Sequence, residues 1–293
     1  MELHRDKFEL LRYGDNGEIK SETQYISNTG LVIKEEDQVR DLGVIMHSSG
    51  SFSPQIQKLV TEGRKQCGWI LRTFNTRARL PMLTLWKSLV MSRLEYCSQL
   101  WCPLKKGEIQ ALEMVQRTFL RKITGMSELS YWEQLKKLNM YSLERRRERY
   151  RIIYTWKVLE KRVPNIGNDR IKSKTHQRRG RECFPPKVNQ YCSRKVQNLI
   201  YASLPVHGQQ LFNCLPLEIR NMTKCEVDTF KGALDKYLMT VPDEPLIRGY
   251  EKFRRAESNS LLDMTKFASK PGDSLLDTTE SPPTTRCDSQ SLP

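Results

Sequence analysis

Apolar residues recur at three- and four-residue steps through the middle of the chain, which is the spacing of amphipathic helices. One stripe covers residues 53–74, and Ser53 followed by a proline is a favourable helix start. A second stripe covers residues 81–101 and ends before Pro103. The pattern therefore predicts two long helices joined by a short link, each burying one face in a common core.

Three further helices are predicted downstream of these two. The stripe over residues 109–123 is stopped by Gly125, and residues 131–138 have the spacing of a short helix. Ser142 is placed to cap a fifth helix that extends to about Lys161. Several antiparallel helices joined by short loops form a bundle.

The segments on either side of the bundle have different patterns. Residues 7–13, 18–26, 31–34 and 39–46 predict three or four short antiparallel strands, with Gly43 marking a bulge or a close backbone approach. After Pro164 the apolar period is lost, and residues 172–187 are expected to form a loop until helical spacing returns near Val196. From Arg248 onward Ser, Thr, Asp and Pro dominate, which predicts a disordered tail.

These patterns place the chain in the mainly α class, with a small N-terminal antiparallel β hairpin region followed by a helical bundle. The expected parts are the strand region 1–50, the bundle 51–163, a basic helical extension 164–245 and a disordered tail 246–293.

Positive charge is concentrated rather than spread along the chain. The net charge of the 293 residues is +15, and residues 142–195 alone hold 17 lysines and arginines against 5 acidic residues. A one-sided positive field favours polyanions, of which nucleic acid is the commonest partner, although a merely solvated basic face is the alternative. The candidate phosphate-binding residues lie at the link between the first two helices and on the fifth helix: Arg72, Arg77, Arg79, Arg145, Arg146, Arg147, Arg149 and Arg151.

The five tryptophans are expected in the core rather than stacked on bases, because each has apolar neighbours at helical spacing. They are Trp69, Trp86, Trp101, Trp132 and Trp156.

Several classes of protein are not favoured by the sequence. No run approaches eighteen apolar residues and no signal segment begins the chain, so we expect no membrane span, no secretion and an intracellular location in nucleus or cytoplasm. The eight cysteines lack Cys-x-x-Cys spacing, which favours reduced thiols over a metal site. No nucleophile–His–acid set or Gly-rich phosphate loop is present, so no catalytic residue is assigned. The oligomeric state stays open.

Nine short strings, in this order and spacing over roughly residues 1–245, resemble one protein family. They are KFELLRYG, DLGV, GWILRTF, LWKSLVMSRLEYCSQLW, LEMVQRTFLRKITG, YWEQLKKLNMYSLERRRERYRIIYTWKVLE, LFNCLPLEIRN, FKGALDKYL and PDEP. The chain looks like the part after the catalytic centre in reverse transcriptases of non-LTR, LINE-type retrotransposons of animals.

The resemblance implies that the N-terminal strands end a polymerase palm and that residues 53–161 form the thumb over the template–primer duplex. Its hairpin that grips the primer end would contain Asp41, Leu42, Gly43 and Val44. Polymerases of this family hold two Mg²⁺ ions on aspartates that include an adjacent pair, and this chain contains no Asp-Asp pair.

The resemblance thus implies a truncated RNA-directed DNA polymerase without catalytic aspartates or a cofactor of its own. It would bind RNA, DNA or an RNA–DNA hybrid through phosphates. The alternative is a helical protein–protein interaction module recruited from a mobile element.

Overall fold

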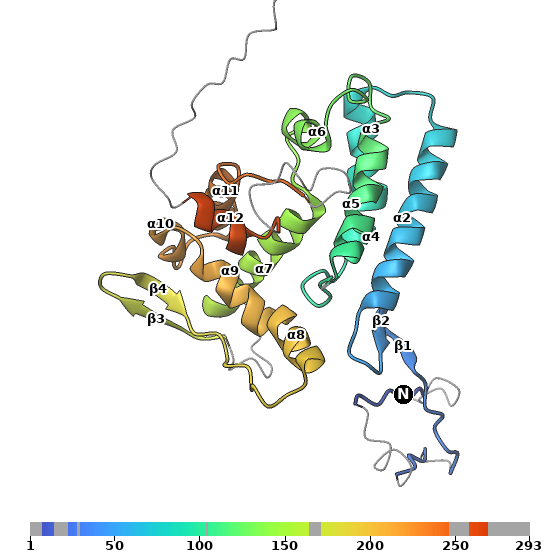
Figure 1. Cartoon of the computed structure of the whole chain (residues 1–293), viewed down its shortest axis with the longest axis vertical. Coiled ribbons are helices and arrows are strands. Elements are labelled where there is room, and N and C mark those ends of the chain that lie inside the picture. The colour runs from blue at the N-terminus through green and yellow to red at the C-terminus, as the bar shows by residue number, and fades with distance from the viewer. Residues whose placement is uncertain are drawn as a thin grey trace, which may run out of the picture.

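A computed structural model of the chain describes residues 8–14, 23–27, 30–103, 105–163, 171–245 and 258–268. This part is mainly helical and carries a small antiparallel hairpin near its N-terminus, as the apolar pattern predicted (Figure 1). Two groups of buried apolar side chains form two cores, one around helices α2 to α6 and one around helices α9 to α12. Helix α7 (Leu143–Leu159) contributes to both cores and lies between the two sets of helices in Figure 1.

The N-terminal hairpin pairs β1 (Gln38–Asp41) with β2 (Val44–His47). Leu42 and Gly43 form the turn, and both have positive φ, at 43° and 89°, as two-residue hairpin turns require. Of the other predicted strands, the described residues form only isolated bridges, Leu10 to Glu35 and Ile26 to Val32, so the larger sheet is not present there.

Helix α2 (Ser53–Thr73) follows the predicted boundaries and packs along α5 (Lys106–Leu120). Gly63 allows this close approach, since a Cβ at this position would lie 3.2 Å from a Val115 methyl and 3.3 Å from Leu94. The first core is built from the apolar faces of these helices, with Trp86 against Phe119 at 5.2 Å between ring centroids.

The second predicted helix is shorter than expected and is irregular. It consists of α3 (Arg79–Leu85), a π-helical segment η2 (Trp86–Met91) and α4 (Ser92–Glu95). The prediction that it continues to residue 101 is wrong, because Cys97 has a φ of 52° and the chain forms tight turns there. The fully buried Trp101 fixes this end, since its indole N–H donates to the Tyr96 carbonyl at 2.9 Å.

Local capping explains the next two helix starts. Helix α6 (Tyr131–Leu138) begins with a reciprocal capping box between Ser130 and Glu133. Ser142 caps α7 as predicted, because its hydroxyl accepts the Arg145 backbone N–H at 3.1 Å.

Residues 172–187, predicted as a loop, contain a second hairpin made of β3 (Ser173–His176) and β4 (Gly180–Cys183). The reason is tertiary. The Arg181 guanidinium is buried and donates to the Glu160 carboxylate at 2.6 Å, and the Cys183 N–H donates to the Asn213 side chain.

Five helical segments of the described chain lie between the second hairpin and residue 245, and the last three of them contribute to the second core. They are α8 (Arg194–Ala202), the π-helical η3 (Leu204–Gly208), α9 (Gln209–Asn213), α10 (Leu217–Arg220) and α11 (Val227–Leu238). Trp156 of α7 stacks on Phe230 of α11 at 4.5 Å between ring centroids.

The predicted disordered tail contains an ordered helix, α12 (Leu261–Ala268). Leu261 and Met264 are 0% and 3% exposed and belong to the second core, so the prediction is wrong for residues 258–268. The remainder of the predicted tail, residues 246–257 and 269–293, lies outside the described residues. Within the described ranges, no helix has both the length and the apolarity needed to cross a membrane.

Candidate nucleic-acid interface

The ends of three helices meet at one end of the first bundle. Helix α2 ends at Thr73 and α3 begins at Arg79, while the chain leaving α5 returns to the link between them. There the Thr124 backbone N–H donates to the Arg77 carbonyl at 2.9 Å. Figure 1 shows α2, α3 and α5 side by side at this end. We call the four exposed cationic side chains of this region the basic joint: Arg72, Arg79, Arg121 and Lys122.

Arg77, which was predicted to bind phosphate together with Arg72 and Arg79, has a structural role at this joint. Its guanidinium donates to the backbone carbonyls of Leu71 and Thr76, both at 2.8 Å, and to that of Phe74. Carbonyls in the last turn of a helix lack helical partners and favour a positive charge nearby. Arg77 therefore closes the end of α2, whereas Arg72 and Arg79 remain exposed.

The outer surface of α2 to α4 carries positive charge that no acidic residue of the same stretch compensates. Residues 63–94 contain seven lysines and arginines and no Asp or Glu. Six of these cations are exposed: Arg64, Lys65, Arg72, Arg79, Lys87 and Arg93. Within the part of the chain that the structure describes, none of the six forms an ion pair. Their charges are therefore available to an external anion.

One tryptophan lies on this cationic surface instead of in the core. Trp69 is 45% exposed on α2, within one helical turn of Lys65 and Arg72, and it meets Phe74 edge to face at 6.0 Å between ring centroids. The prediction of a core position is wrong for Trp69, since its neighbours Cys67 and Ile70 occupy the buried stripe of α2. Three other tryptophans, Trp86, Trp101 and Trp156, are fully buried as predicted, and Trp132 is partly buried.

The five arginines of α7 do not form an exposed cationic surface. Arg145, Arg147 and Arg151 are 0%, 3% and 1% exposed, so the expected cationic helix end is wrong for these three. The physical reason is that α7 lies between the two cores, where carboxylates and carbonyls from distant segments converge on its polar side.

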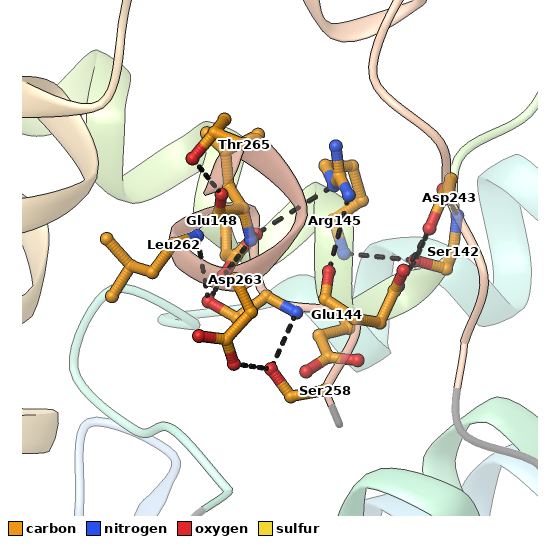
Figure 2. Close-up of polar contacts among 12 residues, drawn as sticks. Ser142, Glu144, Arg145, Glu148, Asp243, Ser258, Leu262, Asp263 and Thr265 are labelled. Atoms are coloured by element: carbon orange, nitrogen blue, oxygen red, sulfur yellow. Dashed lines mark hydrogen bonds and ion pairs between the residues drawn. The ribbon is translucent and has the colours of Figure 1, made fainter. Parts of the chain in front are cut away.

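Arg145 belongs to a buried polar network that joins α7 to the C-terminal part of the chain (Figure 2). Its Nη2 donates to the Pro242 carbonyl at 2.9 Å, and its Nε lies 3.8 Å from the Glu148 carboxylate. Asp243 accepts both the backbone N–H and the hydroxyl of Ser142 at 2.7 Å. The network fixes Pro242 and Asp243 against the start of α7.

Glu148 connects the same network to α12. Its carboxylate accepts the Ser260 hydroxyl at 2.6 Å and the Leu261 backbone N–H at 2.9 Å. A carboxylate at a helix N-terminus is favourable because the first N–H groups of the helix lack partners. Burial raises the pKa of Glu148, and the adjacent Arg145 opposes that shift.

Arg146 and Arg149 are partly buried and paired with carboxylates from other helices. The Arg146 guanidinium binds Glu95 at the end of α4, with Nη2 at 3.0 Å from Oε2. The Arg149 guanidinium binds Asp235 of α11, with Nη2 at 2.7 Å from Oδ2. Both contacts use two nitrogens of the arginine, so these charges are largely neutralised where they lie.

Arg147 and Arg151 lie deeper, in the wall of a cavity. Arg151 donates from Nη1 to the Ala202 carbonyl at 2.7 Å, and the same nitrogen is 3.1 Å from Nδ1 of His207. Burial and the nearby Arg151 lower the pKa of His207 to about 3, so the ring is neutral and Nδ1 can accept this bond. The Arg147 guanidinium lies over the Trp101 ring at 6.0 Å from its centroid.

The four residues predicted to form a primer-gripping hairpin form the turn of β1–β2. The Tyr96 hydroxyl donates to the Leu42 carbonyl at 2.9 Å and so attaches the turn to the end of α4. Leu42 is 83% exposed, whereas Val44 is buried in the first core. The structure therefore separates the predicted residues into the hairpin turn, the basic joint and the interior of α7.

No metal centre is found in the described ranges, where no three His, Cys, Asp or Glu side chains gather in a way that could hold an ion. Comparisons with models of protein families, with curated proteins and with solved structures find no match to this chain.

The candidate interface thus differs from the predicted set in two ways. Arg121, Lys122 and Trp69 were not among the predicted binding residues, and the five predicted arginines of α7 are buried or paired with carboxylates. The absence of acidic residues over 63–94 was a usable signal, because local charge compensation can be counted in the sequence. The partners of the α7 arginines, such as Glu95 and Asp235, are 51 and 86 residues away and could not be assigned from spacing.

Proposed function

We propose that this chain is the primer-gripping hairpin and thumb of a truncated non-LTR retrotransposon reverse transcriptase. In this proposal it binds template–primer nucleic acid through phosphates and does not itself polymerise. The proposal rests on the resemblance of the nine sequence strings and on the chemistry of the exposed surface.

The observation that carries the binding proposal is the unpaired positive charge of α2 to α4. Arginines and lysines that already bind carboxylates gain little from a phosphate, as for Arg146 and Arg149. The six exposed cations of residues 63–94 have no such partner in the described part of the chain. Contacts of this kind neutralise phosphates without reading sequence, so binding is expected to be weakly sequence-specific and strongly salt-dependent.

Trp69 adds a second mode of contact to the same surface. An exposed aromatic ring beside cations can stack on an unpaired base, which contributes about 1–3 kcal/mol in single-strand binding proteins. Its position one turn from Arg72 would place that base next to a bound phosphate.

The test compares two triple substitutions that remove the same charge from different places. The first variant changes three basic-joint residues to Ala: Arg72, Arg79 and Arg121. The second variant changes three exposed residues of the β3–β4 region to Ala: Arg178, Arg179 and Lys187. Fluorescence anisotropy with an RNA–DNA hybrid is expected to show about tenfold or more weakening for the first variant and much less for the second.

Equal weakening by both triple variants would contradict a localised interface. Absence of binding to hybrid, duplex and single strands would favour the alternative of a protein–protein interaction module. Circular dichroism of each variant controls for folding, and all six side chains are exposed, so little change in stability is expected.

The second part of the proposal concerns catalysis. The related enzymes use paired aspartates to hold two metal ions, and this chain has no adjacent aspartates. Primer extension with template RNA, dNTPs and Mg²⁺ or Mn²⁺ is expected to give no product. Extension above that of a mock purification would contradict this expectation.

A further inference from the structure

A cavity of about 390 Å³ lies between α7 and the helices α8 and α9. Cys102 and Pro103 close one side of it, and Ser260, just before α12, contributes to another. Cavities of this size commonly hold small molecules in proteins. None of the residues assigned to the basic joint lines it.

The wall that α7 contributes is charged, although it is an interior face of the helix. Glu144, Arg147, Glu148 and Arg151 all line the cavity and follow the spacing i, i+3, i+4, i+7. In a helix packed on a core, this stripe is normally apolar. A stripe of four ionisable side chains at these positions therefore needs partners inside the fold.

In the described residues, hydrogen bonds are found for only some of the polar atoms of these four side chains. Glu148 accepts bonds from Ser260 and Leu261, as described above. Three buried atoms have no hydrogen-bond partner: Nη2 of Arg147, Nε of Arg151 and Oε2 of Glu144. Arg147 and Arg151 are at least nine-tenths buried. Incomplete hydrogen bonding of buried charged groups is unfavourable, so a ligand with acceptor oxygens beside the Arg147 and Arg151 side chains that line the cavity would stabilise this arrangement.

The other walls include polar side chains that can donate hydrogen bonds, beside apolar ones such as Ile109 and Ala202. Asn198 and Tyr201 lie one turn apart on α8 at the cavity, with Tyr201 48% exposed, and Gln210 belongs to α9. His207 uses Nδ1 as the acceptor from Arg151, so in the neutral ring Nε2 carries the proton. The lining thus combines two guanidinium groups with amide, phenol and imidazole groups that can donate to one anion.

We propose that this cavity binds a phosphate group, either as inorganic phosphate or as a phosphomonoester such as a sugar phosphate. The two guanidinium groups of α7 would meet the phosphate oxygens, as arginine pairs suit tetrahedral oxyanions. The side chains of Asn198 and Tyr201 complete the site at its entrance. The cavity volume leaves room for a sugar beyond the phosphate.

Glu144 sets the pH range in which the site accepts an anion. Burial, with the neighbouring Glu148 and Glu113 carboxylates, raises the pKa of Glu144 to about 8, while Arg147 opposes the shift. The other charged or titratable groups facing this region are Asp243, Arg151, the neutral His207, Cys102 and Tyr201. Below pH 8 Glu144 is protonated and does not repel an anion, and above pH 8 its charge disfavours binding.

The experiment measures the affinity of the full chain for inorganic phosphate and for ribose 5-phosphate by calorimetry, at constant ionic strength adjusted with NaCl. Because substitution of the buried Arg147 or Arg151 can unfold the protein, the test variant combines Asn198→Ala with Tyr201→Phe at the entrance. Loss of two hydrogen bonds to a charged ligand is expected to weaken binding about tenfold or more. Arg178→Ala, an exposed charge away from the cavity, is the matched control and should leave the affinity unchanged.

The pH arm gives an independent readout. Between pH 7 and pH 9.5 the wild-type affinity should fall, although phosphate itself becomes more negative, whereas Glu144→Gln should retain its affinity. A preference for ribose 5-phosphate would identify a phosphomonoester as the ligand, and equal affinity would identify the phosphate group alone.

Failure of both probes to bind at pH 7 would overturn the proposal. Equal weakening by Arg178→Ala would also overturn it, since the effect would then not be specific to side chains at the cavity entrance. The triple variant of Arg72, Arg79 and Arg121 should bind phosphate in this cavity with wild-type affinity. Phosphate binding in the cavity and nucleic-acid binding at the basic joint can therefore be tested independently.

Discussion

Single residues of α7 carry the largest expected energetic effects, because their charges are buried. Arg145 is fully buried and bonds to the Pro242 carbonyl while lying beside Glu148. Arg145→Ala would leave the Glu148 carboxylate without its cation in the interior. Removing one partner of a buried ion pair is expected to lower the free energy of unfolding by about 3 kcal/mol.

Urea unfolding followed by circular dichroism measures this effect. Arg178→Ala, at an exposed position, serves as the control and should change stability by less than about 0.5 kcal/mol. Similar small changes for both variants would mean that Arg145 is not buried in solution.

Glu144 provides a residue-level prediction about pH. Its pKa is raised to about 8 in the folded chain, above that of an unfolded glutamate, chiefly by burial. The folded state then holds its proton more tightly than the unfolded state, so this residue's contribution to stability falls as pH rises from about 4.5 to 8. The Glu144→Gln variant has no ionisable carboxyl at this position. Its free energy of unfolding at pH 9 should therefore exceed that of the wild type by at least about 1 kcal/mol.

The comparison is made by urea unfolding at pH 5 and pH 9. At pH 5 Glu144 is protonated in the folded chain, and the difference between the two proteins should largely vanish. A constant difference at both pH values would show that Glu144 ionises normally in the fold.

At the level of elements, α12 has the clearest testable role, because it supplies side chains to the second core from beyond residue 257. Leu261 is fully buried, and its backbone N–H binds Glu148. Leu261→Ala should lower the free energy of unfolding by about 2–5 kcal/mol, as other buried leucine truncations do. The same substitution at Leu80, which is 78% exposed, is the control and should have little effect. Equal effects would mean that α12 does not pack on the core.

The elements also show which parts of the fold were predictable. Helix α2 follows from apolar spacing with a proline in its first turn, and α6 follows from apolar spacing with a capping box at Ser130, because these signals are local in the sequence. The β3–β4 hairpin depends on Arg181 reaching Glu160, and the early end of α4 depends on Trp101 folding back on Tyr96. Interactions of this kind are tertiary, and no local pattern in the sequence contains them.

The candidate site was predictable to a smaller extent than the fold. The exposure of Arg72 and Arg79 could be expected because helix ends beside a short link are often exposed, whereas the structural role of Arg77 in the same link depends on the carbonyls at the end of α2. Arg145, Arg147 and Arg151 were misplaced because a run of arginines has the same sequence whether it is solvated or buried among distant carboxylates. Density of charge along the chain is therefore a poor guide to density of charge on the surface.

The whole molecule combines a bundle with an unpaired cationic surface and a second core, joined through α7. Its segment of highest charge in the sequence, residues 142–195, supplies ion pairs that hold these parts together, including Arg149 to Asp235 and Arg181 to Glu160. Exposed cations without such partners in the described residues lie on α2 to α4 and at the basic joint, and a second group lies in the β3–β4 region and at the start of α8: Lys172, Lys174, Arg178, Arg179, Lys187, Arg194 and Lys195. This division predicts that α7 variants lose stability and that basic-joint variants lose binding.

The most direct measurement is the affinity of the wild-type chain for an RNA–DNA hybrid across a series of salt concentrations. Binding through the basic joint predicts a linear fall of log K with log salt, with a slope of about −3 to −6 for four to six phosphate contacts. The Arg72, Arg79 and Arg121 triple variant should have a slope smaller in magnitude by about 3. A flat salt dependence, or the same slope for wild type and variant, would contradict the account.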